Sequence, residues 1–129
     1  MFRLVKVLNG NTQADIHLIP DPDTSFSLGN AVVCHNNKTE KVPATGLPEY
    51  IILGRNYVTH KGFVAAQLIT EDSIFKVEYT GSVKPYVGMP VGISTYITGS
   101  DAVTYNINGK GSVTRVDNNS GLVYVRFRK

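Results

Sequence analysis

The chain has 129 residues, of which 42% are hydrophobic and 18% charged, so it is long enough for one domain with a core and too apolar for a disordered chain. Its longest apolar runs, such as Tyr50-Ile51-Ile52-Leu53, are far shorter than the roughly 18 residues of a membrane helix. The net charge is +3, and the excess lies in residues 81–129, which carry six basic and two acidic residues. A solubilising surface is the favoured interpretation of this excess, which also suits an acidic partner such as nucleic acid.

Cysteine usage and the first residues favour synthesis and assembly in a reducing cytoplasm. Cys34 is the single cysteine, so the chain cannot form an internal disulfide. The first eight residues mix Arg3 and Lys6 into an apolar stretch, which differs from the unbroken apolar core of a secretion signal.

The N-terminal third contains short strand candidates separated by turns. Residues 2–8 predict a strand, and residues 14–19 are expected to pair back with it across an Asn-Gly-Asn turn. A further strand is predicted over 26–33, and residues 35–40 are interpreted as an exposed loop. The Pro- and Gly-containing segment 43–48 is the best internal boundary.

That boundary predicts two regions. Residues 1–48 form an N-terminal β-rich arm or hairpin, which packs either on the body or on a partner. Residues 49–129 form a compact body, in which residues 63–69 are interpreted as a strand because of their length and β-branched flanks. Residues 73–79 alternate apolar and charged side chains with the period of two that is typical of a half-buried strand.

The C-terminal third shows the clearest alternation. Residues 91–98 repeat the two-residue period, and a three-stranded antiparallel meander is predicted from 102–107, 112–116 and 122–128. Asn108-Gly109 suits the positive φ angles of a tight hairpin turn between the first two of these strands. Together the elements predict an all-β fold, a small antiparallel β-barrel or β-sandwich.

Residues able to carry chemistry are few and scattered. His17, His35 and His60 lack the spacing of metal ligands. Cys34 and His35 are adjacent, and neighbouring strand residues point to opposite faces, which disfavours a nucleophile–base pair. We therefore expect no catalytic, cofactor-binding or metal-binding residues.

Tyr124, Arg126 and Arg128 are expected to share one face of the last strand. With Tyr105 and Arg115 nearby, such a stripe is typical of a small barrel that binds single-stranded nucleic acid. It is equally typical of an ordinary exposed face or of a protein interface, because interfaces favour Tyr and Arg. These two interpretations stay open, and both are favoured over nucleic-acid binding.

The segment 47–127 resembles the capsid decoration, or cement, proteins of tailed bacteriophages. The resemblance is a pattern of strands and glycine turns, and it is carried by these runs: Tyr50-Ile51-Ile52-Leu53-Gly54, Ile69-Thr70-Glu71-Asp72-Ser73-Ile74-Phe75-Lys76-Val77, Val87-Gly88-Met89-Pro90-Val91-Gly92-Ile93, Gly109-Lys110-Gly111-Ser112-Val113-Thr114-Arg115-Val116-Asp117 and Gly121-Leu122-Val123-Tyr124-Val125-Arg126-Phe127.

The resemblance implies a structural virion protein that binds the outside of an assembled capsid, and the major capsid protein as its partner. It further implies a homo-oligomer, with a trimer favoured, and an N-terminal arm that adds a strand to a neighbour. The residues expected to contact a partner are Phe2, Arg3, Leu4, Val5, Lys6 and Val7, together with Tyr124, Arg126 and Arg128. The alternatives are a head–tail joining or tail protein, or a module that binds single-stranded nucleic acid.

Overall fold

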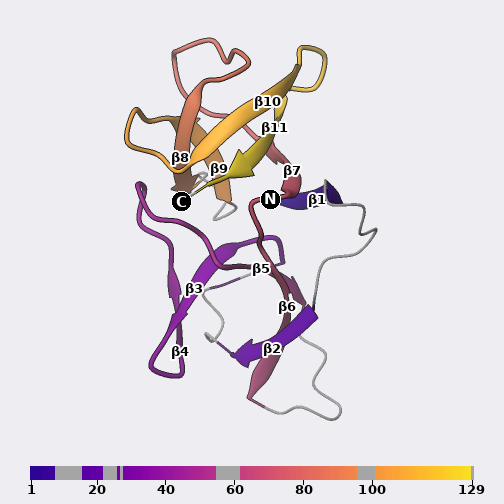
Figure 1. The fold of residues 1–129 in the computed structure, drawn as a ribbon, viewed down its shortest axis with the longest axis vertical. Helices are drawn as coiled ribbons and strands as arrows, with labels where there is room; N and C mark the ends of the chain where they lie inside the picture. The colour runs from indigo at the N-terminus through magenta and orange to yellow at the C-terminus, as the bar shows by residue number, and fades with distance from the viewer. Residues whose placement is uncertain (8–15, 22–25, 27, 55–61, 96–100, 129) are drawn as a thin grey trace.

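The structure, a computed structural model, describes residues 1–7, 16–21, 26, 28–54, 62–95 and 101–128. Within these ranges the chain forms eleven β-strands and no helix, in two antiparallel sheets. The six-stranded sheet lies above the five-stranded sheet in Figure 1.

The six-stranded sheet contains the first strand and the last five, in the spatial order β1-β7-β11-β10-β8-β9. Its strands are β1 (Arg3–Val7), β7 (Ser73–Glu78), β8 (Pro90–Thr95), β9 (Asp101–Tyr105), β10 (Gly111–Asp117) and β11 (Leu122–Phe127). β11 alternates as predicted, and β7 does so from Phe75 onward, with Phe75, Val77, Val123 and Val125 buried on the inner face. That alternation is the pattern of strands with one solvated face.

The five-stranded sheet has the order β2-β6-β5-β3-β4. Its strands are β2 (Ile16–Pro20), β3 (Ala31–His35), β4 (Lys38–Lys41), β5 (Tyr50–Gly54) and β6 (Phe63–Leu68). Residues 63–68 therefore form the strand that their β-branched flanks predicted.

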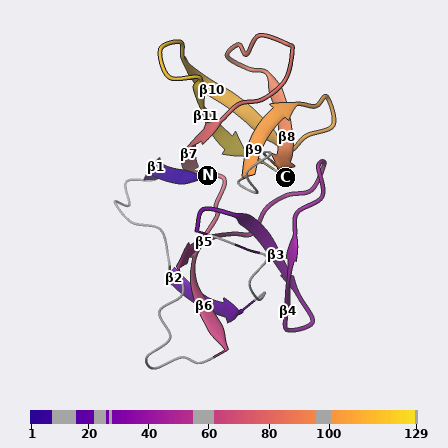
Figure 2. The ribbon, with the colours of Figure 1, turned by 180° about the vertical axis from the view of Figure 1, so that it is seen from behind.

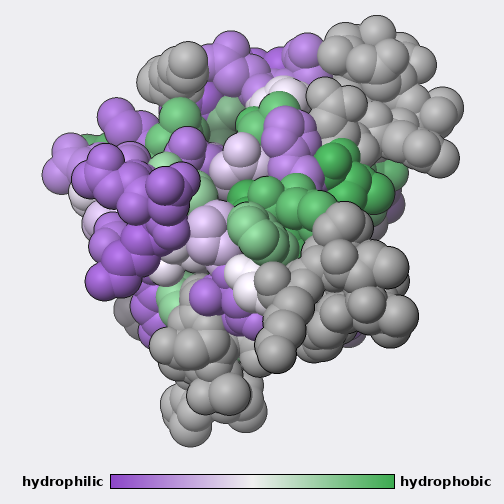
Figure 3. Space-filling model, turned by 90° about the horizontal axis from the view of Figure 1, so that it is seen from below, coloured by the Kyte–Doolittle hydropathy of each residue, from purple (hydrophilic) through white to green (hydrophobic). Residues whose placement is uncertain are grey.

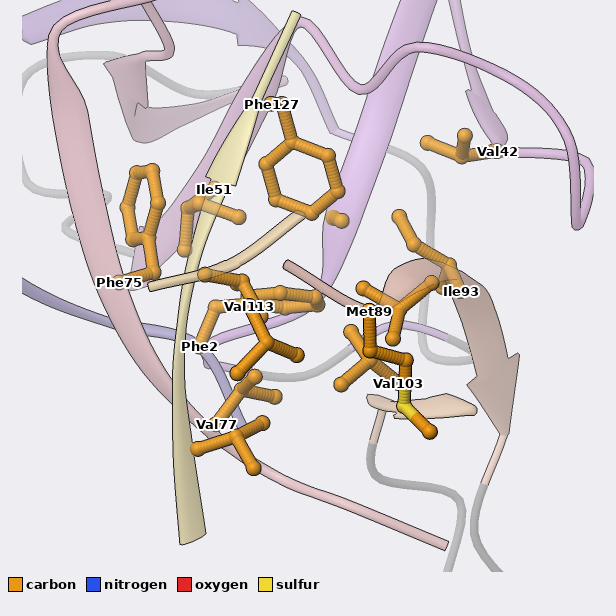
Figure 4. Packing of buried hydrophobic residues seen from close by; sticks show 14 of the residues in the cluster. Phe2, Val42, Ile51, Phe75, Val77, Met89, Ile93, Val103, Val113 and Phe127 are labelled. Atoms are coloured by element: carbon orange, nitrogen blue, oxygen red, sulfur yellow. The ribbon is translucent and has the colours of Figure 1, made fainter. Parts of the chain in front are cut away.

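β3 and β5 are buried on both faces, which explains their continuous apolar runs. Ile51 and Val33 point into the main core, which the six-stranded sheet encloses from the other side. Val32 and Ile52 point the opposite way, into a second, smaller cluster inside the five-stranded sheet. Figure 4 shows Ile51 among the side chains of the main core, which ties the two sheets together.

The predicted fold class is confirmed as all-β with two antiparallel sheets, as in a β-sandwich. Neither sheet is closed into a barrel. The six-stranded sheet curls until Tyr79, just beyond β7, reaches Val103 of β9, and one isolated bridge joins the two residues there. A single bridge supplies too few ladder hydrogen bonds to close the sheet.

The predicted C-terminal meander is wrong in one pairing. β10 and β11 form the expected antiparallel hairpin. β9, however, pairs with β8, which lies between β9 and β10. Gly109 has no positive φ; instead, a Cβ atom there would lie 2.1 Å from the carbonyl oxygen of Val91. The glycine permits close packing against β8 rather than a tight hairpin turn.

The tight hairpin lies elsewhere, in the segment interpreted as an exposed loop. β3 and β4 are joined by Asn36 and Asn37, with φ angles of 51° and 60°. Two successive positive φ angles are the geometry of a two-residue hairpin turn, and Asn tolerates them better than most residues. The Asn-Asn pair could have indicated this turn, but the polar residues around it favoured the interpretation as a loop.

Residues 1–48 supply strands to both sheets. β1 pairs with β7 in the six-stranded sheet, whereas β2, β3 and β4 belong to the five-stranded sheet. The expected pairing of residues 14–19 with 2–8 is wrong, because β2 pairs with β6. The boundary predicted at 43–48 falls between β4 and β5, two members of the same sheet.

Candidate interaction surface

The residues considered for catalysis do not converge. His17 lies on β2 with its ring 5.7 Å from that of Tyr50, and His35 ends β3 as an exposed residue. Cys34 is half-buried, and His60 lies outside the described residues. In the described part of the chain, no three His, Cys, Asp or Glu side chains gather as a metal site would require.

Phe2 holds the N-terminal strand in the core. Its side chain is 2% exposed and makes an edge-to-face contact with Phe75, with ring centroids 6.1 Å apart. Its ring also lies 5.8 Å from that of Phe127 (Figure 4). The sequence predicted a strand over residues 2–8, but only the packing shows that the Phe2 side chain is part of the core.

β1 lies at the margin of the six-stranded sheet. Figures 1 and 2 show β1 outside β7 from opposite sides of the molecule. No described strand pairs with its other edge. Arg3 and Val5 are exposed, and Leu4 packs partly against the core. The side chains of Lys6 and Val7 lie outside the described part of the structure.

Apolar side chains are exposed near this edge and on the five-stranded sheet. A hollow of about 260 Å³ beside β1 is lined by residues that include Leu4, Leu28 and Leu53. On β2 and β6, Ile16 is 65% exposed and Phe63 44%. Figure 3 shows an apolar area on the underside of the molecule, the end at which β2 lies in Figure 1. Exposed apolar area of this kind is typical of protein-contact surfaces.

Four side chains form a row across the outer face of the six-stranded sheet. The strand register aligns Arg3 of β1 with Lys76 of β7, Lys76 with Tyr124 of β11, and Tyr124 with Arg115 of β10. We call Arg3, Lys76, Tyr124 and Arg115 the basic row. Lys76 Nζ lies 5.6 Å from the centroid of the Tyr124 ring, and Arg115 Cζ lies 5.1 Å from it.

The predicted stripe on β11 has the expected geometry and an unexpected set of contacts. Residues 122–127 alternate half-buried and buried, so Tyr124 and Arg126 face outward together, and Arg128 is exposed just beyond the strand. Arg126 is engaged by Asp72, at 3.3 Å, and by the carbonyl of Glu71. Lys76 and Arg115, rather than Arg126, lie over Tyr124. Lys76 was not expected beside Tyr124, because cross-strand register is not visible in a linear sequence.

A polar junction links the two sheets beside the N-terminus. The backbone N–H of Ala31 donates to Asp101 Oδ2 at 2.7 Å, and the α-amino group of Met1 donates to the Asp101 carbonyl at 2.7 Å. The same α-amino group pairs with Glu78. Burial raises the pKa of Asp101 above its ordinary value, and the Ala31 hydrogen bond partly opposes that rise.

None of the described segments contains a helix long and apolar enough to cross a membrane. Comparison of the chain with protein-family models, with curated proteins and with solved structures finds no match.

Proposed function

We propose that this chain is a structural virion protein that binds the outer surface of a phage capsid, as a trimer, and stabilises the shell. The proposal starts from the resemblance of residues 47–127 to capsid decoration proteins. The partner of the chain is then the major capsid protein, to which the chain binds without catalysing a reaction.

The observation that carries the proposal is the arrangement of β1. Phe2 fixes the strand in the core, while the opposite edge of the strand has no described neighbour. Such an edge can pair with an extended segment of another chain through backbone hydrogen bonds. The anchor keeps the edge in place before binding, which lowers the conformational entropy lost on association.

The exposed apolar side chains support the same function. Ile16, Leu18 and Leu28 are each about half exposed or more, close to sheet edges. Burying them against a neighbour would be favourable in proportion to the area removed from water. A shell repeats each contact many times, so weak contacts at one subunit become strong in the assembly.

The direct test is cosedimentation of the purified chain with capsids assembled from the major capsid protein of the same genome. We expect saturable binding and a higher melting temperature of the capsids, and a trimer when the free chain is sedimented alone. A ring of six or twelve copies without capsid binding would instead indicate a head–tail joining or tail protein. Failure to bind capsids, together with retention on single-stranded DNA at low salt, would overturn the proposal in favour of a nucleic-acid-binding module.

A further inference from the structure

We propose that the basic row binds an acidic protein segment, with carboxylates at alternate residues of an extended chain. The inference rests on the proposed function, because it names the chemistry of the partner that this face of the protein recognises.

The row is long enough for several contacts. Arg3 and Arg115 lie at its ends, three strand spacings apart, which corresponds to about 14 Å at about 4.8 Å per spacing. In an extended segment, side chains on one face repeat about every 6.8 Å. Three carboxylates at alternate residues therefore match the length of the row.

The cations of the row are available to a partner. Among the described residues, Arg3, Lys76 and Arg115 form no ion pair, whereas Arg126 is paired with Asp72. Arg3 and Arg115 are exposed, and Lys76 is half-buried. Tyr124 holds Lys76 and Arg115 near its ring, which orders both side chains before a partner arrives.

The carboxylates near the row are already engaged. Glu78, two residues beyond Lys76 on β7, pairs with the α-amino group of Met1. Asp117, two residues beyond Arg115 on β10, has a pKa lowered chiefly by a hydrogen bond with the Ser120 side chain, and it accepts the Asn119 N–H at 3.1 Å. Lys76 contributes a smaller lowering. Because the Met1 α-amino group offsets Glu78, the three cations of the row face one uncompensated negative charge beside them on that side, that of Asp117.

These carboxylates favour an acidic protein segment over nucleic acid. Glu78 and Asp117 flank the row along one side and Asp72 along the other, so the positive charge is confined to a narrow line that suits one extended chain, whereas a bulkier sugar-phosphate backbone would lie against the flanking carboxylates. The Tyr124 ring is contacted by two cations, and a stacked base would have to displace them. A guanidinium such as that of Arg115 also suits a carboxylate, because it binds both oxygens at once.

The test is a fluorescence-anisotropy titration of the full chain with a short labelled peptide that has Glu at every second position. We expect binding that weakens as salt is added, because exposed charges are screened. The double variant Lys76→Glu with Arg115→Glu should bind roughly tenfold more weakly or worse, because each reversal turns attraction into repulsion. The matched control is Lys84→Glu with Lys110→Glu, which makes the same change of charge at exposed lysines outside the row and should lose less than about twofold.

Each outcome decides the proposal. No binding of the peptide by the unaltered chain at low salt, or equal losses in the two double variants, would overturn it. Tighter binding of an oligothymidine probe that the row variant abolishes would assign the face to nucleic acid instead. Backbone amide shifts of the unaltered chain on peptide addition must concentrate on β1, β7, β10 and β11, which gives an answer even if the row variant fails to fold. Capsid cosedimentation that persists when the peptide does not bind would leave the proposed function standing and remove this inference alone.

Discussion

The side chain of Asp101 links the two sheets through a hydrogen bond. It is 6% exposed, and its carboxylate accepts the backbone N–H of Ala31 from the other sheet. A buried carboxylate is costly, and a buried N–H without an acceptor is costly as well. Removing the aspartate side chain would leave the Ala31 N–H without this acceptor.

We expect Asp101→Ala to lower the free energy of unfolding by about 1–3 kcal/mol, because the buried Ala31 N–H loses its acceptor. Asp101→Asn should cost less, because its amide oxygen can still accept that hydrogen bond. Urea unfolding at neutral pH measures both. Equal losses in the two variants would show that the hydrogen bond is not the reason for the destabilisation.

Comparison of the unaltered chain with Asp101→Asn also tests how stability depends on pH. Burial raises the pKa of Asp101 in the folded chain above its ordinary value of 3.8, so the folded state keeps the proton to higher pH than the unfolded state. The contribution of this group to stability is present at low pH and is lost as pH rises through the folded pKa. The free energy of unfolding of Asp101→Asn, minus that of the unaltered chain, should therefore rise as pH increases above 3.8. A difference that stays flat or falls would contradict a raised pKa of Asp101.

At the scale of elements, β1 combines an anchor with an open edge. Phe2 packs against Phe75 and Phe127, and the strand pairs with β7 through a register shift between Leu4 and Lys6. Such a shift marks a β-bulge, which bends an edge strand and limits indiscriminate pairing. The charge of Arg3 on the outer face adds to that protection.

Phe2→Ala should lower the free energy of unfolding by about 3–5 kcal/mol, because it leaves a cavity among buried rings. Val5→Ala on the same strand is the control. Its side chain is 47% exposed, so we expect a change within about 0.5 kcal/mol. Chemical unfolding followed by far-UV circular dichroism measures both. A small effect of Phe2→Ala would mean that β1 is detached in solution, as an arm would be.

At the scale of the whole molecule, the two sheets share one core. The main cluster includes Ala31, Val33 and Ile51 from the five-stranded sheet beside Phe75 and Val125 from the six-stranded sheet. Because β3 and β5 are buried on both faces, neither sheet can keep its apolar side chains from water without the other. We therefore expect the chain to unfold as one cooperative unit.

A fragment of residues 49–129 should not fold, because it lacks β1–β4 and would expose the partners of Ile51 and Phe75. The measurement is thermal unfolding followed by circular dichroism, with the full chain as the control. The full chain should show one transition that coincides for all probes, and the fragment should show none. A sharp transition in the fragment would instead support the predicted division at residue 48.

The linear order of residues was sufficient for the strands with the clearest alternation. Alternation in residues 73–79 and 122–128 predicted β7 and β11 and their inner faces, because a strand's two-residue period is set by the backbone alone. Asn36-Asn37 carried a hairpin signal too, although the polar surroundings favoured a loop. The grouping of Tyr124 with Arg126 on one face followed from the same period.

What the sequence determined by itself is therefore the all-β character and the faces of the stronger strands, since both arise from neighbours along the chain. Only the tertiary structure decided that β8 lies between β9 and β10, that Phe2 is part of the core and that Lys76 lies beside Tyr124. The physical reason is that strand order and register are set by which apolar faces can be buried together. That choice depends on contacts between residues that are far apart in the chain.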